Sequence, residues 1–150
     1  MIQRKQTLWL LLAAISVLLI FYFPFGITAK TVVDSTTSAE TPLSASANQP
    51  LGMLGILASI LSIVTIFLFK NRPLQIKLIW TTILETTGIL VLQFYIANNS
   101  IEGNKLVVGI LGSNIYLGIF VPLLTLFFLI LAVMGIRQDE KLVRDTDRLR

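Results

Sequence analysis

The sequence predicts an all-α membrane protein in which four transmembrane helices form a bundle with the N- and C-termini in the cytoplasm. Its composition, its long uncharged apolar runs and its one-sided Lys and Arg distribution predict this class. Hydrophobic residues make up 55% of the 150 residues and charged residues only 13%, which is about half the charged share of soluble domains. A soluble fold of this size buries about 70% of its unfolded surface, too little to hide so much apolar side chain. We therefore expect residues 1–150 to form a single transmembrane domain.

The first predicted span covers residues 7–25, which carry no charge. As a helix this run is about 28 Å long, close to the thickness of the hydrocarbon core. Arg4 and Lys5 precede it, and Tyr22 and Pro24 supply an aromatic anchor and a helix breaker near its end. A cleavable secretory signal also has a basic start and an apolar core. The length of the core favours a retained span, and either outcome leaves the later loops on the same sides.

Residues 26–50 are predicted to form a flexible extracytoplasmic loop. From Asp34 to Pro50 the chain is rich in Ser, Thr, Ala, Asn and Pro, and Leu43 is its only large apolar residue. Such a segment buries too little apolar surface to offset the entropy lost on ordering.

The second predicted span, residues 51–69, carries small residues along one helix face. Gly55 and Ser59 stand four residues apart, and Ser62 extends the stripe. Small residues at this spacing let a neighbouring backbone approach closely. We expect the stripe to mediate helix packing within the monomer, with dimerisation as the alternative.

The third predicted span, residues 78–96, is the least apolar of the four and follows a basic connector at residues 70–77, where Pro73 predicts a turn. Its polar residues form the candidate intramembrane site: Thr81, Thr82, Glu85, Gly88 and Gln93. Thr81 and Gly88 share a helix face with Glu85. We expect the polar stripe to face away from lipid.

The fourth predicted span covers residues 115–136, and residues 106–112 before it are interpreted as an interfacial segment. Pro122 lies inside this span, so the Gly118 carbonyl loses its helical donor and a kink is predicted. The following tail, residues 137–150, mixes five bases with four acids. It is interpreted as a solvated helical extension near anionic headgroups, or alternatively as a docking tail for a cytoplasmic partner.

The distribution of Lys and Arg predicts the orientation. Ten of the twelve lie before the first span, in the connector or in the tail, and the other two loops carry only Lys30 and Lys105. This bias follows the positive-inside rule. It predicts four crossings of the inner membrane with both ends of the chain in the cytoplasm.

Three cytoplasmic segments resemble a known family. The segments are Met1-Ile2-Gln3-Arg4 with Gln6-Thr7, Phe69-Lys70-Asn71-Arg72 with Leu74-Gln75, and Ile136-Arg137 with residues 139–144 and 147–150. Together they are similar to the domain-of-unknown-function 4293 family, small four-span inner-membrane proteins of Bacteroidota. The resemblance covers the whole chain. It implies a four-helix inner-membrane protein. The family has no assigned activity and no functional residues that could be carried over to this chain.

Glu85 is the one residue of the predicted spans that could carry chemistry, because an ionisable group at that depth is energetically costly. One interpretation is that Glu85 hydrogen-bonds threonine hydroxyls or backbone carbonyls on adjacent helices and fixes their packing. The alternative is a small transporter, or a proton- or cation-coupled membrane protein, that uses Glu85 as a relay. We favour the packing role.

The residue types and motifs that the chain lacks exclude most other classes of function. The chain has no His and no Cys, which removes imidazole and thiol catalysis and most transition-metal ligands. No phosphate-binding or metal motif is present, so we expect no enzyme activity, cofactor or metal, and the basic residues are explained by orientation rather than nucleic acid. The expected partners are the lipid bilayer and either a second copy or another membrane protein. The preferred function is a structural or accessory role through helix–helix association.

Overall fold

The structure is a computed structural model of the chain. It describes residues 3–27, 42–69, 71–99, 110–111, 114–115 and 117–148, and side chains within 6–26, 43–69, 71–97, 99 and 117–141.

Four α-helices make up most of the described residues. They are α1 (Gln3–Leu18), α2 (Gln49–Phe67), α3 (Arg72–Asn99) and α4 (Val121–Arg148). Short 3₁₀ turns extend two of them: η1 (Leu19–Phe21) follows α1, and η2 (Leu117–Ile119) precedes α4. Two antiparallel pairs of short strands join β1 (Gly26–Ile27) to β2 (Pro42–Leu43), and β3 (Ile110–Leu111) to β4 (Asn114–Ile115).

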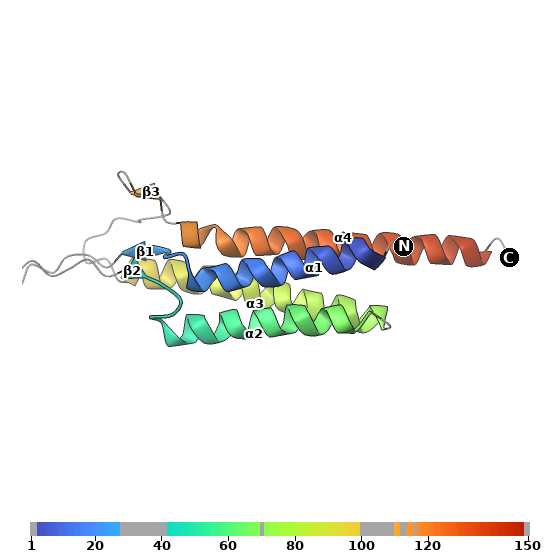
Figure 1. Cartoon of the computed structure of the whole chain (residues 1–150), viewed down its shortest axis with the longest axis horizontal. Coiled ribbons are helices and arrows are strands. Elements are labelled where there is room, and N and C mark those ends of the chain that lie inside the picture. Colours follow the sequence, from blue (N-terminus) through green and yellow to red (C-terminus); the bar gives the residue numbers. More distant parts are fainter. Residues whose placement is uncertain are drawn as a thin grey trace, which may run out of the picture.

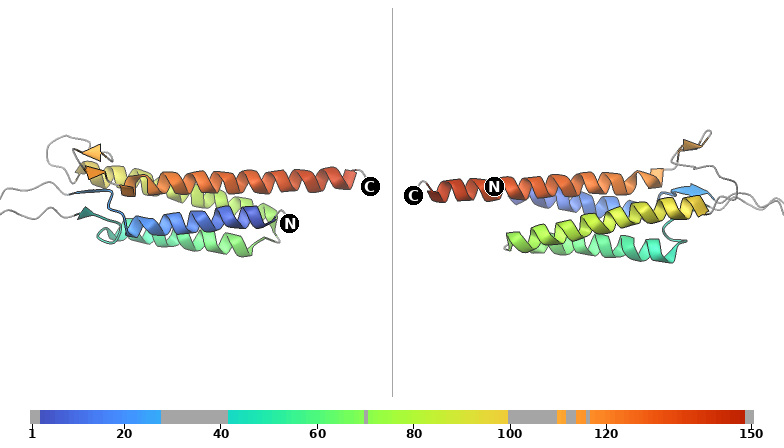
Figure 2. Two further views of the ribbon diagram at one scale, coloured as in Figure 1. Left: turned by 45° about the horizontal axis from the view of Figure 1, so that its top comes forward. Right: turned by 180° about the vertical axis from the view of Figure 1, so that it is seen from behind.

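The helices lie side by side, and each runs antiparallel to the one before it (Figure 1). Helix α1 contacts α2 and α4, and α3 contacts the same two helices from the opposite side, as the two further views show (Figure 2). One end of the bundle holds the start of α1, the turn between α2 and α3, and the part of α4 from Arg137 onward. We call it the basic end. The other, the hairpin end, holds η1, η2 and the β1–β2 pair.

Three helices are long and apolar enough to cross a membrane, over Gln49–Phe67, Arg72–Ala97 and Leu117–Lys141. The corresponding apolar stretch at the start of the described chain, Gln6–Phe21, is shorter. Together α1 and η1 nevertheless extend about 30 Å. They lie alongside the other helices over the same thickness of the bundle (Figure 2).

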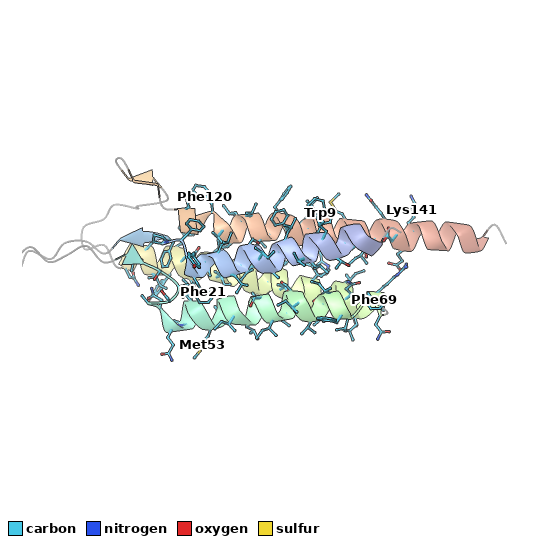
Figure 3. All side chains as sticks on the ribbon, in the orientation of Figure 1. Trp9, Phe21, Met53, Phe69, Phe120 and Lys141 are labelled. Atoms are coloured by element: carbon cyan, nitrogen blue, oxygen red, sulfur yellow. The ribbon has the colours of Figure 1, made fainter. Side chains whose placement is uncertain are left out.

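Large apolar side chains cover the outside of the bundle on all four helices. They are Leu8, Leu11, Ile15 and Leu18 on α1, Met53, Ile56, Ile60 and Ile63 on α2, Trp80, Leu84, Val91 and Phe94 on α3, and Leu123, Phe127, Ile130 and Met134 on α4. Figure 3 shows side chains projecting from the outer faces of the helices. In water this surface would cost a large hydrophobic free energy, whereas in lipid it matches its solvent.

The core consists of two apolar clusters, one toward each end. The cluster at the hairpin end includes Val17, Ile20, Phe25, Leu51, Ile89 and Ile119, and the cluster at the basic end includes Leu10, Ala13, Ile79, Leu129, Val133 and Ile136. Each cluster takes members from non-adjacent parts of the chain and so joins the helices at its level.

The predicted loop 26–50 is ordered at its two margins, which differs from the prediction. Gly26 and Ile27 pair with Leu43 and Pro42, and the backbone N–H of Phe25 donates to the Leu43 carbonyl at 2.9 Å. Leu43 and Ala45 are buried in the cluster at the hairpin end, so this burial orders the end of the segment. Residues 28–41 lie outside the described residues.

Helix α3 begins earlier than the predicted span 78–96. Arg72 and Lys77 belong to the helix, and Pro73 is its second residue, where the missing N–H costs no helical hydrogen bond. The turn between α2 and α3 is therefore confined to Leu68–Asn71, with the Asn71 N–H donating to the Leu68 carbonyl at 3.0 Å.

The predicted kink at Pro122 is wrong. Helix α4 begins at Val121, so Pro122 lies in its first turn and starts a helix rather than bending one. The Gly118 carbonyl is, as predicted, left without a helical donor, but Gln93 Nε2 of α3 donates to it at 3.3 Å. Of the predicted interfacial segment 106–112, only Ile110 and Leu111 lie within the described residues, paired with β4.

Candidate functional site

Buried hydroxyl side chains form a layer between the two apolar clusters. On α1, Ser16 lies between Ala13 of one cluster and Val17 of the other, and on α4 Thr125 lies between Val121 and Leu129. On α2 and α3, buried hydroxyl residues likewise lie between members of the two clusters. This hydroxyl layer consists of Ser16, Ser59, Ser62, Thr82, Thr86 and Thr125. It places polar groups midway along the bundle, where the surrounding exterior is apolar.

Most of these hydroxyls are satisfied by their own helix. Ser62 donates to the Ala58 carbonyl at 2.9 Å, and Thr86 donates to the Thr82 carbonyl at 2.7 Å. This back-bonding is typical of Ser and Thr in helices and lets them enter an apolar environment. One contact crosses between helices, because Ser16 Oγ and Thr125 Oγ1 lie 2.8 Å apart and join α1 to α4.

Glu85 lies at the level of the hydroxyl layer, between Thr82 and Thr86 in the sequence of α3. Its side chain is half-buried, and both carboxylate oxygens are shielded with no hydrogen-bond partner among the described residues. The neighbouring threonines do not supply one, since Thr82 donates to the Leu78 carbonyl at 2.9 Å and Thr86 to Thr82. Glu85 therefore stands beside the layer without joining its hydrogen bonds.

The structure divides the five sequence-predicted site residues between two faces of α3. Thr82 and Gln93 are buried on the inward face, whereas Thr81 and Gly88 are exposed, with Glu85 on the flank between them. Thr81 donates back to the Lys77 carbonyl at 3.1 Å, and no atom lies within 4 Å of a Cβ added at Gly88. The residues thus do not form one continuous polar line.

Two buried glutamines tie α3 to its neighbours at opposite ends. Gln75 Nε2 donates to the Thr65 carbonyl of α2 at 3.3 Å, and Gln93 Nε2 donates to the Gly118 carbonyl of η2 at 3.3 Å. A spacing of 18 residues is five helical turns, so both amides lie on one face and about 27 Å apart. This separation approaches the hydrocarbon thickness of a bilayer.

Gly118 is the point where the end of α1, the end of α3 and the start of α4 meet. Its N–H donates to the Pro24 carbonyl at 3.1 Å, and its carbonyl accepts from Gln93. A Cβ added here would collide with the Phe23 carbonyl oxygen and lie 2.7 Å from the Pro24 carbonyl group. Only glycine permits this approach.

The small-residue stripe of α2 faces into the monomer. Gly55, Ser59 and Ser62 are all buried, and a Cβ added at Gly55 would lie 3.4 Å from side-chain atoms of Ile20 and Phe21. Gly55 thus lets η1 pack closely against α2.

Sequence reasoning missed Ser16, Gln75 and Thr125, and at Gly118 it predicted the freed carbonyl but not the donor from Gln93. The 18-residue spacing of Gln75 and Gln93 was a readable signal for two amides on one helix face. Nothing local distinguishes Ser16 or Thr125, because their roles depend on which helix faces them. A group of three or more acidic, His or Cys side chains suited to a metal ion does not occur among the described residues.

An apolar exterior around a polar interior layer is the arrangement of a multi-pass helical membrane protein. The model of a family described as a domain of unknown function, DUF4293, matches residues 2–149. The chain belongs to this family, which confirms the resemblance seen in the sequence. No curated protein and no solved structure matches the chain.

Proposed function

We propose that the protein crosses the inner membrane four times with both ends in the cytoplasm. The basic end supports this orientation, since the start of α1, the first two turns of α3 and the part of α4 from Arg137 to Arg148 carry eight of the twelve Lys and Arg residues of the chain. Tyr22 and Tyr95 are exposed near the hairpin end and fit an aromatic belt at the opposite interface. The length of α1 with η1 supports a fourth crossing.

On this membrane domain we propose an accessory role, in which α4 presents a charged helix to another membrane protein or to a second copy. The observation that carries the proposal is that α4 continues as one helix past the ends of α1, α2 and α3 (Figure 1). From Arg137 to Arg148 this α4 extension is about 18 Å long. The inward-facing stripe of α2 leaves the extension as the better candidate surface for association.

The base of the extension is attached to the rest of the bundle. Gln6 Nε2 of α1 donates a hydrogen bond to Asp139 Oδ2 of α4. Arg137 and Lys141 on either side of Asp139 are exposed. The base of the extension is thus tied to α1 while Arg137 and Lys141 face outward, and this preorganisation reduces the ordering cost of binding a partner.

Photo-crosslinking tests this role. A photoreactive residue replacing Lys141 on the extension should give one discrete adduct with a polypeptide in native membranes, and replacement of Asp139 by Ala should weaken that adduct. The same residue at exposed, apolar Met53 on the far end of α2 is the matched control and should give only lipid adducts. Adducts that are absent at both positions, or identical at both, would contradict the accessory role.

A second candidate function, proton or cation relay, is favoured by the shielded and unpartnered carboxylate of Glu85. A buried carboxyl without a fixed partner can exchange a proton or a cation when the helices around it open. The hydroxyl layer beside it offers oxygen atoms at the same depth.

Flux measurements in liposomes separate this candidate from a packing role. Glu85→Gln keeps the size of the side chain and removes its ionisation, and a relay predicts at least about a tenfold loss of proton or monovalent-cation flux. Glu140→Gln makes the same chemical change on the α4 extension and serves as the control. Equal flux for the wild type and both variants would exclude the relay.

A further inference from the structure

A cavity of about 560 Å³ opens at the basic end between α1, α2 and α3. It lies beside the turn that joins α2 to α3, near Phe69 (Figure 3). Gln6 and Arg72 line it near the start of their helices, Phe67 and Phe69 line it where α2 ends, and Leu8 and Leu11 line it deeper in the bundle. Along α1 the lining thus passes from polar to apolar.

Its apolar walls are continuous with the outer surface of the bundle. Leu8 is 53% exposed, Leu11 47% and Phe67 73%, so the cavity opens sideways to whatever surrounds the helices. Leu11 lies about 7.5 Å further along α1 than Gln6. A ligand that fits this gradient has a polar group at one end and a hydrocarbon chain at the other.

Arg72 gives the polar end of the cavity its charge. Its side chain is half-buried, and no carboxylate pairs with its guanidinium within the part of the chain that the structure describes. Gln75, also on the lining, directs its Nε2 to the Thr65 carbonyl, and Gln6 directs its Nε2 to Asp139. The lining residues include one cation and no acid, so the cavity is complementary to a negative group.

We propose that this cavity binds an anionic glycerophospholipid. The phosphodiester pairs with the Arg72 guanidinium, whose planar fork suits a phosphate, and an acyl chain lies along Leu8, Leu11 and Phe67. Which membrane leaflet supplies this lipid rests on the proposed orientation, which places the basic end at the cytoplasmic leaflet. The binding itself does not depend on that orientation, so the two proposals fail separately.

Native mass spectrometry of the full chain in detergent tests the site with two lipids of identical acyl chains, phosphatidylglycerol and phosphatidylcholine. The wild-type protein should retain phosphatidylglycerol in preference to phosphatidylcholine. Arg72→Gln should weaken phosphatidylglycerol binding about tenfold, as expected for a charge-assisted hydrogen-bonded pair. Lys77→Gln is the matched control, because it removes one exposed charge from the same helix outside the cavity, and it should change binding less than about twofold.

Leu8→Trp tests the apolar part of the cavity without changing charge. Leu8 is half-exposed, so the larger ring fits without disturbing the core. The ring should occupy the cavity and reduce retention of phosphatidylglycerol about tenfold. Equal losses for Arg72→Gln and Lys77→Gln, or equal retention of the two lipids, would overturn the proposal. Displacement of phosphatidylglycerol by millimolar inorganic phosphate would overturn it too, since the site would then recognise the phosphate group alone.

Discussion

At the scale of single residues, Gly118 shows how a position without a side chain can join three parts of the chain. Its N–H donates to the Pro24 carbonyl, its carbonyl accepts a hydrogen bond from Gln93, and a Cβ added to it would collide with the Phe23 carbonyl oxygen. Backbone atoms on the facing segment cannot move aside as a flexible side chain can. The position therefore tolerates no Cβ without displacement of the segment after η1.

Gly118→Ala should destabilise the protein by about 2 kcal/mol, the usual cost of overpacking a closely packed site. Gly88→Ala is the control, because no atom lies within 4 Å of its added Cβ and alanine is the better helix former by up to about 1 kcal/mol. Thermal unfolding in detergent should thus move the two midpoints in opposite directions. A Gly118→Ala protein as stable as the wild type would mean that the segments do not approach as described.

The candidate site also shows which properties of a single residue can be predicted from the sequence. Glu85 can be found because an acid inside an apolar run is conspicuous whatever the fold. Thr81 and Thr82 are chemically identical, yet one is exposed and the other buried. Successive helical residues point about 100° apart, so the rotation of α3 about its axis decides between them, and packing against α2 and α4 sets that rotation.

At the scale of elements, hydropathy located the apolar helices better than it located their ends. The predicted span 51–69 differs from α2 by only two residues at each end, because the apolar run and the helix are nearly the same stretch of chain. Helix α3 is longer than its predicted span since Arg72 and Lys77 are helical as well as charged. Charge excludes a residue from hydrocarbon but not from a helix.

Pro122 illustrates a tertiary effect that local sequence did not indicate. The Gly118 carbonyl has no helical donor, and the donor that replaces it comes from Gln93 on another helix. Gln93→Leu should therefore cost about 1 kcal/mol. In a Pro122→Ala background the new N–H at position 122 can donate to Gly118, so the same substitution should cost less than about half as much. Denaturant titrations of the four proteins measure this coupling, and equal costs in both backgrounds would rule out the shared carbonyl.

The link between α1 and α4 can be measured in the same way. Ser16→Ala and Thr125→Val remove the two hydroxyls that lie 2.8 Å apart, and their double-mutant cycle should give a coupling of about 0.6 kcal/mol, the average for interhelical hydrogen bonds in membrane proteins. Ser62→Ala combined with Thr125→Val should be additive, because Ser62 bonds to the Ala58 carbonyl of its own helix. Additivity in both cycles would show that the Ser16–Thr125 contact contributes nothing.

At the scale of the whole molecule, the distribution of polar and apolar side chains explains both how the helices pack and why their outer surface suits lipid. Large apolar side chains are exposed on all four helices, and most of the buried polar side chains lie in the hydroxyl layer or donate amide hydrogen bonds to backbone carbonyls. Composition and charge distribution predicted the all-helical membrane class. They did not predict the interior layer, because its members become neighbours only after the helices have packed.

The central claim is that the chain crosses the membrane four times with the basic end in the cytoplasm. The chain has no cysteine, so single cysteines can be placed and labelled without background. The five positions are Gln3, Ser46, Asn71, Asn99 and Lys141, which alternate between the two ends of the bundle.

A membrane-impermeant maleimide applied to intact cells measures the topology directly. Cysteines at Ser46 and Asn99 should be labelled from outside, and those at Gln3, Asn71 and Lys141 should be labelled only after permeabilisation. Labelling of Gln3 together with Ser46 would show that α1 does not cross, and labelling of Asn71 together with Ser46 from outside would contradict the account as a whole.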